Sequence, residues 1–179
     1  IISADWPGAL AGDLAQTYAP DCQPLVLNGC CGNINPWDPF DPAYQADHRR
    51  MGKMLAETVN QVLETIDYHS DIRLDFRCKH IFIPQRSPEP AKLAWARQIL
   101  GEHPEPLKDA TRPDSIDFDW VQANGVLDLA ASQLREPLYD YEIQVVRLGD
   151  AAIVALPGEP FVEGQLELKL RSRAPYTYV

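Results

Sequence analysis

The stretch YDYEIQVVRLGDAAIVALPGEPFVEGQLELKLR, residues 139–171, decides the class of fold. Apolar, aromatic and β-branched residues are frequent in 139–148 and 151–156, and the intervening Gly149-Asp150 is a turn pair typical of a β-hairpin. Two prolines then end the second strand, and residues 161–171 predict a helix. A strand pair followed by a helix predicts a layered fold built from both sheet and helix.

The rest of the chain adds alternating helical and extended segments. The clearest helix is 43–66, where apolar residues recur every three or four positions. The run 24–28 predicts a buried strand that opens into a glycine-rich loop, and 72–83 predicts a strand with one face covered. Together these elements predict an α/β or α+β fold, a mixed sheet flanked by helices. The other expected elements are helices over 7–18, 91–101 and 115–134, and a strand within 174–179.

Composition and charge exclude several classes of function. The 179 residues include 16 Lys plus Arg and 26 Asp plus Glu, which gives a net charge of −10. This balance argues against nucleic acid as a partner, because phosphates are bound by basic patches. No apolar run reaches the ~18–20 residues of a membrane-spanning helix, so no transmembrane segment is expected. The sequence leaves the oligomeric state open.

The four cysteines, Cys22, Cys30, Cys31 and Cys78, are spaced irregularly and include no C-x-x-C metal motif. A disulfide between the adjacent Cys30 and Cys31 would be strained, so reduced thiols are expected. Cys30 or Cys31 as the nucleophile of a thiol hydrolase is one hypothesis, which requires a base such as histidine nearby. Small buried side chains are the alternative interpretation.

The loop Asn28–Pro36, with the sequence NGCCGNINP, is the first candidate site. Glycines after a strand let backbone N–H groups converge on a ligand oxygen, and Gly32 is placed for this role. The side-chain amides of Asn33 and Asn35 add donors suited to an oxyanion. A tight turn that happens to be polar is the alternative.

Glu159 is the second candidate, because it follows the apolar strand 151–156 on a turn between two prolines. A carboxylate held at the end of a strand suits a metal ligand or a general base. The alternative is an acid favoured by the positive end of the helix that begins near Phe161.

The histidines provide no obvious partners for a metal held by Glu159. No two of them have the H-x-x-x-H spacing that places both imidazoles on one helical face. A catalytic zinc site needs three protein ligands and an open position. We therefore expect structural or exposed roles for the four histidines, His48, His69, His80 and His103.

Three segments in this order resemble the catalytic domain of the neutral/alkaline ceramidase family and its bacterial relatives: Ile2–Gly8, Leu25–Pro36 and Ala155–Phe161. The resemblance implies a zinc-dependent amidase that hydrolyses the N-acyl bond of ceramides, with zinc held by two histidines, a glutamate and a tyrosine. The glutamate corresponds to Glu159. Residues 84–138 carry no such resemblance.

The resemblance also implies where the remaining zinc ligands lie. In that family the histidines precede the motif at Ile2–Gly8, and the tyrosine follows the helix after the Pro-Gly-Glu turn. Tyr176 and Tyr178 only lead toward that tyrosine's segment and are not assigned as ligands. We therefore expect residues 1–179 to be a single segment of a larger catalytic domain, truncated at both ends. Family members are often secreted or periplasmic, but the compartment of this chain stays open.

The loop departs from the ceramidase pattern Gly-Asp-Val-Ser-Pro-Asn, because Asn33 replaces the aspartate and Asn35 the serine. Asparagine is not a nucleophile, so the alignment excludes a serine mechanism and leaves the substrate open. The expected enzyme is a zinc hydrolase of an N-acyl amide, acting on a small-molecule amide or lipid. Zinc activates water, while Asn35 and loop N–H groups stabilise the oxyanion. The alternative is a non-catalytic binding module with the same fold.

Overall fold

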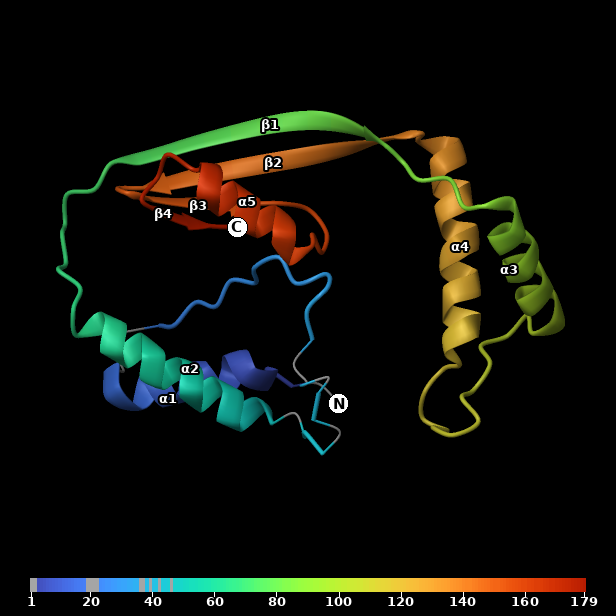
Figure 1. Cartoon of the computed structure of the whole chain (residues 1–179), viewed down its shortest axis with the longest axis horizontal. Helices are drawn as coiled ribbons and strands as arrows, with labels where there is room; N and C mark the ends of the chain where they lie inside the picture. The colour runs from blue at the N-terminus through green and yellow to red at the C-terminus, as the bar shows by residue number, and fades with distance from the viewer. Residues whose placement is uncertain (1–2, 19–22, 36–37, 39, 42, 46) are drawn as a thin grey trace. The chain divides into compact units, whose positions relative to one another are not determined.

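A computed structural model describes residues 3–18, 23–35, 38, 40, 41, 43–45 and 47–179 (Figure 1). Its described residues form five helices and one four-stranded mixed sheet, which confirms the predicted α/β or α+β class. None of these helices is long and apolar enough to cross a membrane. In chain order the elements are α1 (Asp5–Tyr18), α2 (His48–Leu63), β1 (Leu74–Pro84), α3 (Pro90–Glu102), α4 (Phe118–Arg135), β2 (Leu138–Leu148), β3 (Ala151–Ala155), α5 (Val162–Arg171) and β4 (Tyr176–Tyr178).

The chain forms two compact units. Unit 1 comprises Ile1–Cys78 and Gln144–Val179, and unit 2 comprises Lys79–Ile143. Strand order in the sheet is β1-β2-β3-β4, and the boundary between the units passes through β1 and β2. Unit 2 therefore interrupts the sequence of unit 1.

In unit 1 the hairpin expected at Gly149 is present. β2 and β3 are antiparallel, from Gln144 opposite Ala155 to Leu148 opposite Ala151. Gly149 has a φ of 60°, a left-handed conformation that favours glycine, and its N–H donates to the Arg73 carbonyl at 2.8 Å. After α5 the chain returns as β4, which is parallel to β3. This β-α-β connection positions the turn before α5 at the end of β3.

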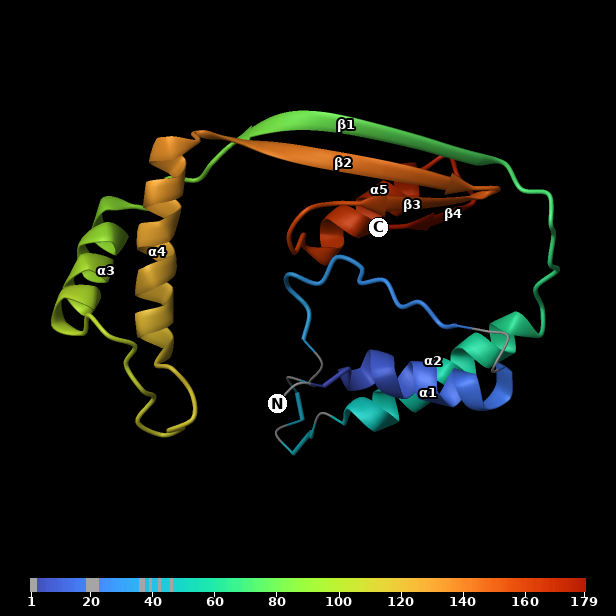
Figure 2. The same cartoon turned by 180° about the vertical axis from the view of Figure 1, so that it is seen from behind.

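Helices α1 and α2 lie side by side in unit 1 (Figures 1 and 2). Their contact buries Leu10, Leu14 and Ala56 in a small apolar core. Gly52 of α2 is buried against α1, and a Cβ added there would lie 2.7 Å from the Leu10 nitrogen. The close packing of the two helices therefore depends on the absence of a side chain at position 52.

Gly52→Ala is expected to lower the free energy of unfolding by about 1–3 kcal/mol, because the methyl group overpacks the contact with α1. The matched control is Gly12→Ala in α1, where an added Cβ meets no atom within 4 Å. Gly12→Ala should stabilise by about 0.5–1 kcal/mol through helix propensity. Urea unfolding of the three proteins measures both effects, and equal stability of the Gly52→Ala variant and the parent would contradict this account.

The first turn of α2 is capped by Asp47, whose Oδ1 accepts the N–H groups of Arg49 at 2.9 Å and Arg50 at 3.3 Å. The N–H groups of Arg50 and then Arg49 lower the pKa of Asp47 below its usual 3.8. This cap explains why the helix begins at His48 rather than at residue 43, where the sequence pattern placed it.

Because its folded pKa is lowered, Asp47 stabilises the fold above pH 3.8, and this contribution is lost as the pH falls through the folded pKa. Asp47→Asn retains a capping oxygen but cannot titrate, so its unfolding free energy should fall less steeply below pH 3.8 than that of the parent. Thermal unfolding between pH 2.5 and 6 tests this difference. Parallel pH profiles of the two proteins would contradict it.

Unit 2 contains the helix pair α3 and α4, which lie side by side in both views (Figures 1 and 2). Small residues make the contact, since Ala96 and Ala123 are completely buried. The indole N–H of Trp120 donates to the His103 carbonyl at 2.9 Å, which joins the start of α4 to the end of α3. At the other end of the pair, the Gln85 N–H donates to the Pro137 carbonyl at 2.9 Å.

Two predictions about strands are wrong. Residues 24–28 form no strand, and Leu25 is 82% exposed rather than buried. The segment lies beside β4, where the Tyr178 hydroxyl donates to the Leu27 carbonyl, but it makes no backbone ladder among the described residues. An apolar run becomes a strand only when a neighbour pairs with its N–H and C=O groups. β1 is a strand as predicted, but neither of its faces is covered in the described residues.

Candidate functional site

The structure brings together the two segments that the sequence singled out. The N–H of Gly32 donates to the Pro160 carbonyl at 3.0 Å, and the N–H of Cys30 donates to the Gln165 side chain at 2.9 Å. A Cβ added at Gly32 would fall on the carbonyl oxygen of Glu159. The loop and the Pro-Gly-Glu turn therefore form one structure, and the Gly32 N–H is occupied by protein rather than offered to a ligand.

Asn33 connects the loop to the first turn of α5. Its Oδ1 accepts the Val162 N–H at 2.9 Å, and its Nδ2 donates to Glu163 Oε2 at 2.8 Å. The residue that precedes α5 in the chain, Phe161, makes no capping bond through its side chain. Asn33 thus supplies, from a distant position in sequence, the acceptor that a helix N-terminus requires.

Asn33→Ala is expected to lower the unfolding free energy by about 0.5–2 kcal/mol, because the Val162 N–H loses its acceptor. Asn35→Ala is the matched control in the same loop, and it should change stability by less than about 0.5 kcal/mol, since its side chain has no hydrogen-bond partner among the described residues. Denaturant unfolding separates the two. Equal losses for both variants would show that Asn33 has no special structural role.

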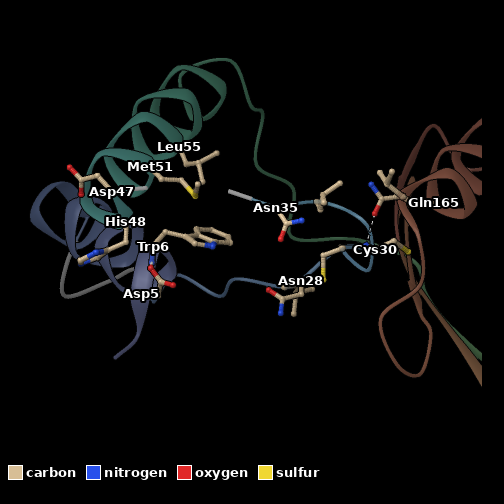
Figure 3. Close-up of a pocket in the computed structure, with 15 residues that line it drawn as sticks. Asp5, Trp6, Asn28, Cys30, Asn35, Asp47, His48, Met51, Leu55 and Gln165 are labelled. Atoms are coloured by element: carbon tan, nitrogen blue, oxygen red, sulfur yellow. Dashed lines mark hydrogen bonds between the residues drawn. The ribbon is translucent and has the colours of Figure 1, made fainter. Parts of the chain in front are cut away.

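A cavity of about 640 Å³ in unit 1 adjoins this loop (Figure 3). Trp6 of α1 and Met51 of α2 point toward the loop that carries Cys30 and Asn35, as the close-up shows. The helix wall combines apolar and ionisable side chains, and the loop wall contains amides and a thiol. The residues that line the 640 Å³ cavity include Trp6, Met51, Leu55, Asp5, Asp47 and His48 on the helix side, and Asn28, Cys30 and Asn35 on the loop side.

Glu159 does not line the 640 Å³ cavity. Its side chain is exposed, and it lines a neighbouring cavity of about 440 Å³ at the end of β3 together with Tyr178. Both cavities share residues 27–31, but Asn35 lines only the first and Glu159 only the second. Burial, followed by the nearby Cys30 and Cys31, raises the pKa of Tyr178, so its phenol remains a donor at neutral pH.

The described residues do not assemble a zinc site around Glu159. No group of three or more His, Cys, Asp or Glu side chains among them includes this residue. Zinc requires at least three such protein ligands. The residues present therefore do not fit the zinc ion expected at Glu159.

The thiol hypothesis has one histidine near its nucleophiles, because His48 lines the same cavity as Cys30 and Cys31. Cys30 is buried and Cys31 half-buried, both as free thiols, which agrees with the expected absence of a bond between them. Neither thiol makes a hydrogen bond to a histidine among the described residues. Cys22 lies outside the described residues, as do Ile2 and Pro36 of the quoted motifs.

A second cluster, which the sequence interpretation missed, lies within unit 2 and contains His80, Asp140 and Glu142. His80 Nδ1 lies 2.8 Å from Asp140 Oδ1, and its Nε2 lies 3.6 Å from Glu142 Oε2. The hydrogen bond and charge of Asp140 raise the pKa of His80. The sequence contained a signal that these side chains share a face. Residues 78 and 80 are two apart within one strand, and residues 140 and 142 are two apart within another, so each pair lies on one face of its strand.

Comparison of the chain with known protein families, with curated proteins and with solved structures finds no match in any of the three. Assignment of function to this chain therefore depends on its own residues and geometry.

Proposed function

We propose that unit 1 is the substrate-binding part of a hydrolase of N-acyl amide bonds that resembles neutral ceramidase. The observation that carries this proposal is the 640 Å³ cavity, in which the apolar side chains of Trp6, Met51 and Leu55 share the lining with the amides of Asn28, Asn35 and Gln165. An N-acyl amide has the matching chemistry, an apolar acyl chain next to a polar amide. The juxtaposition of the loop with the Pro-Gly-Glu turn supports the resemblance, because two separated family motifs lie against each other.

In this proposal the acyl chain packs against Trp6, Met51 and Leu55, and Asn35 Nδ2 donates to the acyl carbonyl oxygen. A donor at this oxygen stabilises the charge that develops there during hydrolysis. Asn35 suits the role better than Asn33, whose amide is already bonded to α5. The described residues assemble no zinc site around Glu159, so no step of this proposal depends on a metal there.

A non-catalytic binding module is the second candidate. The observation that favours it is the absence, in the described ranges, of any metal-ligand group around Glu159. Such a module would bind the same amide or lipid without turnover. Binding and hydrolysis must therefore be measured separately.

Binding is tested with a fluorescent N-acyl amide titrated into the 179-residue chain. Asn35→Ala should weaken binding by about 5–10-fold, the value of one net hydrogen bond of about 1–1.5 kcal/mol. Asn124→Ala, which removes an exposed asparagine from α4, serves as the control and should bind like the parent. Absence of binding by the parent chain, or equal affinity of the Asn35→Ala variant, would overturn the assignment of the cavity.

Hydrolysis is tested on the full-length gene product that contains these residues, with a fluorogenic N-acyl substrate, with and without a chelator. The hydrolase proposal expects turnover that Asn35→Ala reduces by about 100-fold, because one donor to the developing oxyanion is lost. Binding without turnover would establish the binding module instead. Turnover that is insensitive to chelator but blocked by iodoacetamide would favour the thiol hydrolase.

A further inference from the structure

We propose that unit 1 contains a binding site for a phosphate group, in a second cavity lined by arginines. This cavity has a volume of about 290 Å³, and all the residues that line it belong to unit 1. Three of them are Arg77, Arg147 and Arg173. The proposal does not depend on the proposed function, because the two cavities share no lining residue.

The β2–β3 hairpin determines where this cavity opens. Arg147 of β2 is opposite Ala152 of β3 in the register of the sheet. Side chains directly opposite each other on neighbouring strands point to the same face. Ala152 has only a methyl group, so it fills little of the space beside the guanidinium group of Arg147. Arg173 lines the same cavity from the short segment between α5 and β4.

Two of the three guanidinium groups have donors available for a ligand. Arg147 Nε donates to the Gly149 carbonyl at 2.8 Å, and the two terminal nitrogens of Arg147 have no acceptor among the described residues. Arg173 makes no hydrogen bond or ion pair within the described part of the chain. A guanidinium group presents its N–H donors in a planar fork that matches the oxygens of a phosphate. Arg147 and Arg173 are therefore the expected ligand-binding residues.

The acidic residues at the cavity do not cancel its positive charge. Arg77 donates to Asp75 at 2.7 Å, so these two charges offset each other. Asp150 is the remaining acid of the lining, against the two other arginines. The cavity therefore carries a net charge of +1, in a chain whose net charge is −10. A local excess of positive charge on an acidic protein favours an anionic ligand.

The remaining lining indicates a phosphate attached to a small organic group. A phosphate monoester carries close to two negative charges at neutral pH, which two guanidinium groups can balance. Phe76 also lines the cavity, and its side chain is 51% exposed, so its ring can contact the organic group. The N–H groups of Gly149 and Ala174 already donate within the protein. Recognition of the anion therefore depends on the arginine side chains.

Titration of inorganic phosphate and of phenyl phosphate into the 179-residue chain at low ionic strength tests the site, with phosphorus NMR as the readout. Both ligands should bind saturably, and phenyl phosphate should bind more tightly because its ring contacts Phe76. Arg173→Gln should weaken binding of both by about 10-fold or more, the effect of losing one charge-assisted hydrogen bond. Asp150→Asn should tighten binding, because it removes a repelling carboxylate. Equal affinities would identify the free phosphate ion, rather than an ester, as the ligand.

Two further variants separate the site from general charge effects. Arg97→Gln in α3 removes the same charge from unit 2 and should bind phosphate like the parent. Ala152→Leu keeps every charge but fills the cavity, so it should abolish binding. Circular dichroism verifies that each variant is folded, and Arg173→Gln breaks no bond among the described residues. Absence of saturable binding by the parent, or unchanged affinity of the Arg173→Gln variant, would overturn the proposal.

Discussion

The amide of Asn33 is the contact on which the arrangement of unit 1 most depends. One side chain accepts from the first turn of α5 and donates to an acidic residue of the same helix, so it holds the loop to the helix in a fixed orientation. The glycine-rich loop buries few apolar atoms, so its order depends on polar contacts of this kind, which also include the bonds of Gly32 to Pro160 and of Cys30 to Gln165. The position of Asn35 and Cys30 at the cavity wall follows from this contact.

Two asparagines in one loop, separated by Ile34, therefore have different roles. Asn33 is bonded through both its oxygen and its nitrogen, whereas Asn35 lies at a cavity wall without a partner in the described part of the chain. Sequence pattern gave both the same interpretation as oxyanion donors. Only the fold shows which amide is already satisfied, since the partner of Asn33 lies 129 residues away.

The sequence predicted the helices and the β2–β3 hairpin well, because these elements depend on local periodicity and turn chemistry. Residues 24–28 were predicted wrongly because pairing with a neighbouring strand is a long-range property. The same limit explains the candidate sites. The contact between the loop and the turn before α5, and the approach of His80 to Asp140, both join residues from distant parts of the sequence. The strand over 139–148 was predicted from the sequence, but the approach of its Asp140 to His80 was not.

The hydrogen bond between Gln85 and Pro137 closes the base of the α3–α4 segment. Residues 86–136 thus leave strand β1 and return to strand β2 at a single point, which is the topology of a domain insertion. Closing a loop of about 50 residues costs only slightly more entropy than closing one half as long, roughly 0.6 kcal/mol per doubling. Changes in the length of residues 86–136 therefore cost little free energy in the strands that bracket this segment.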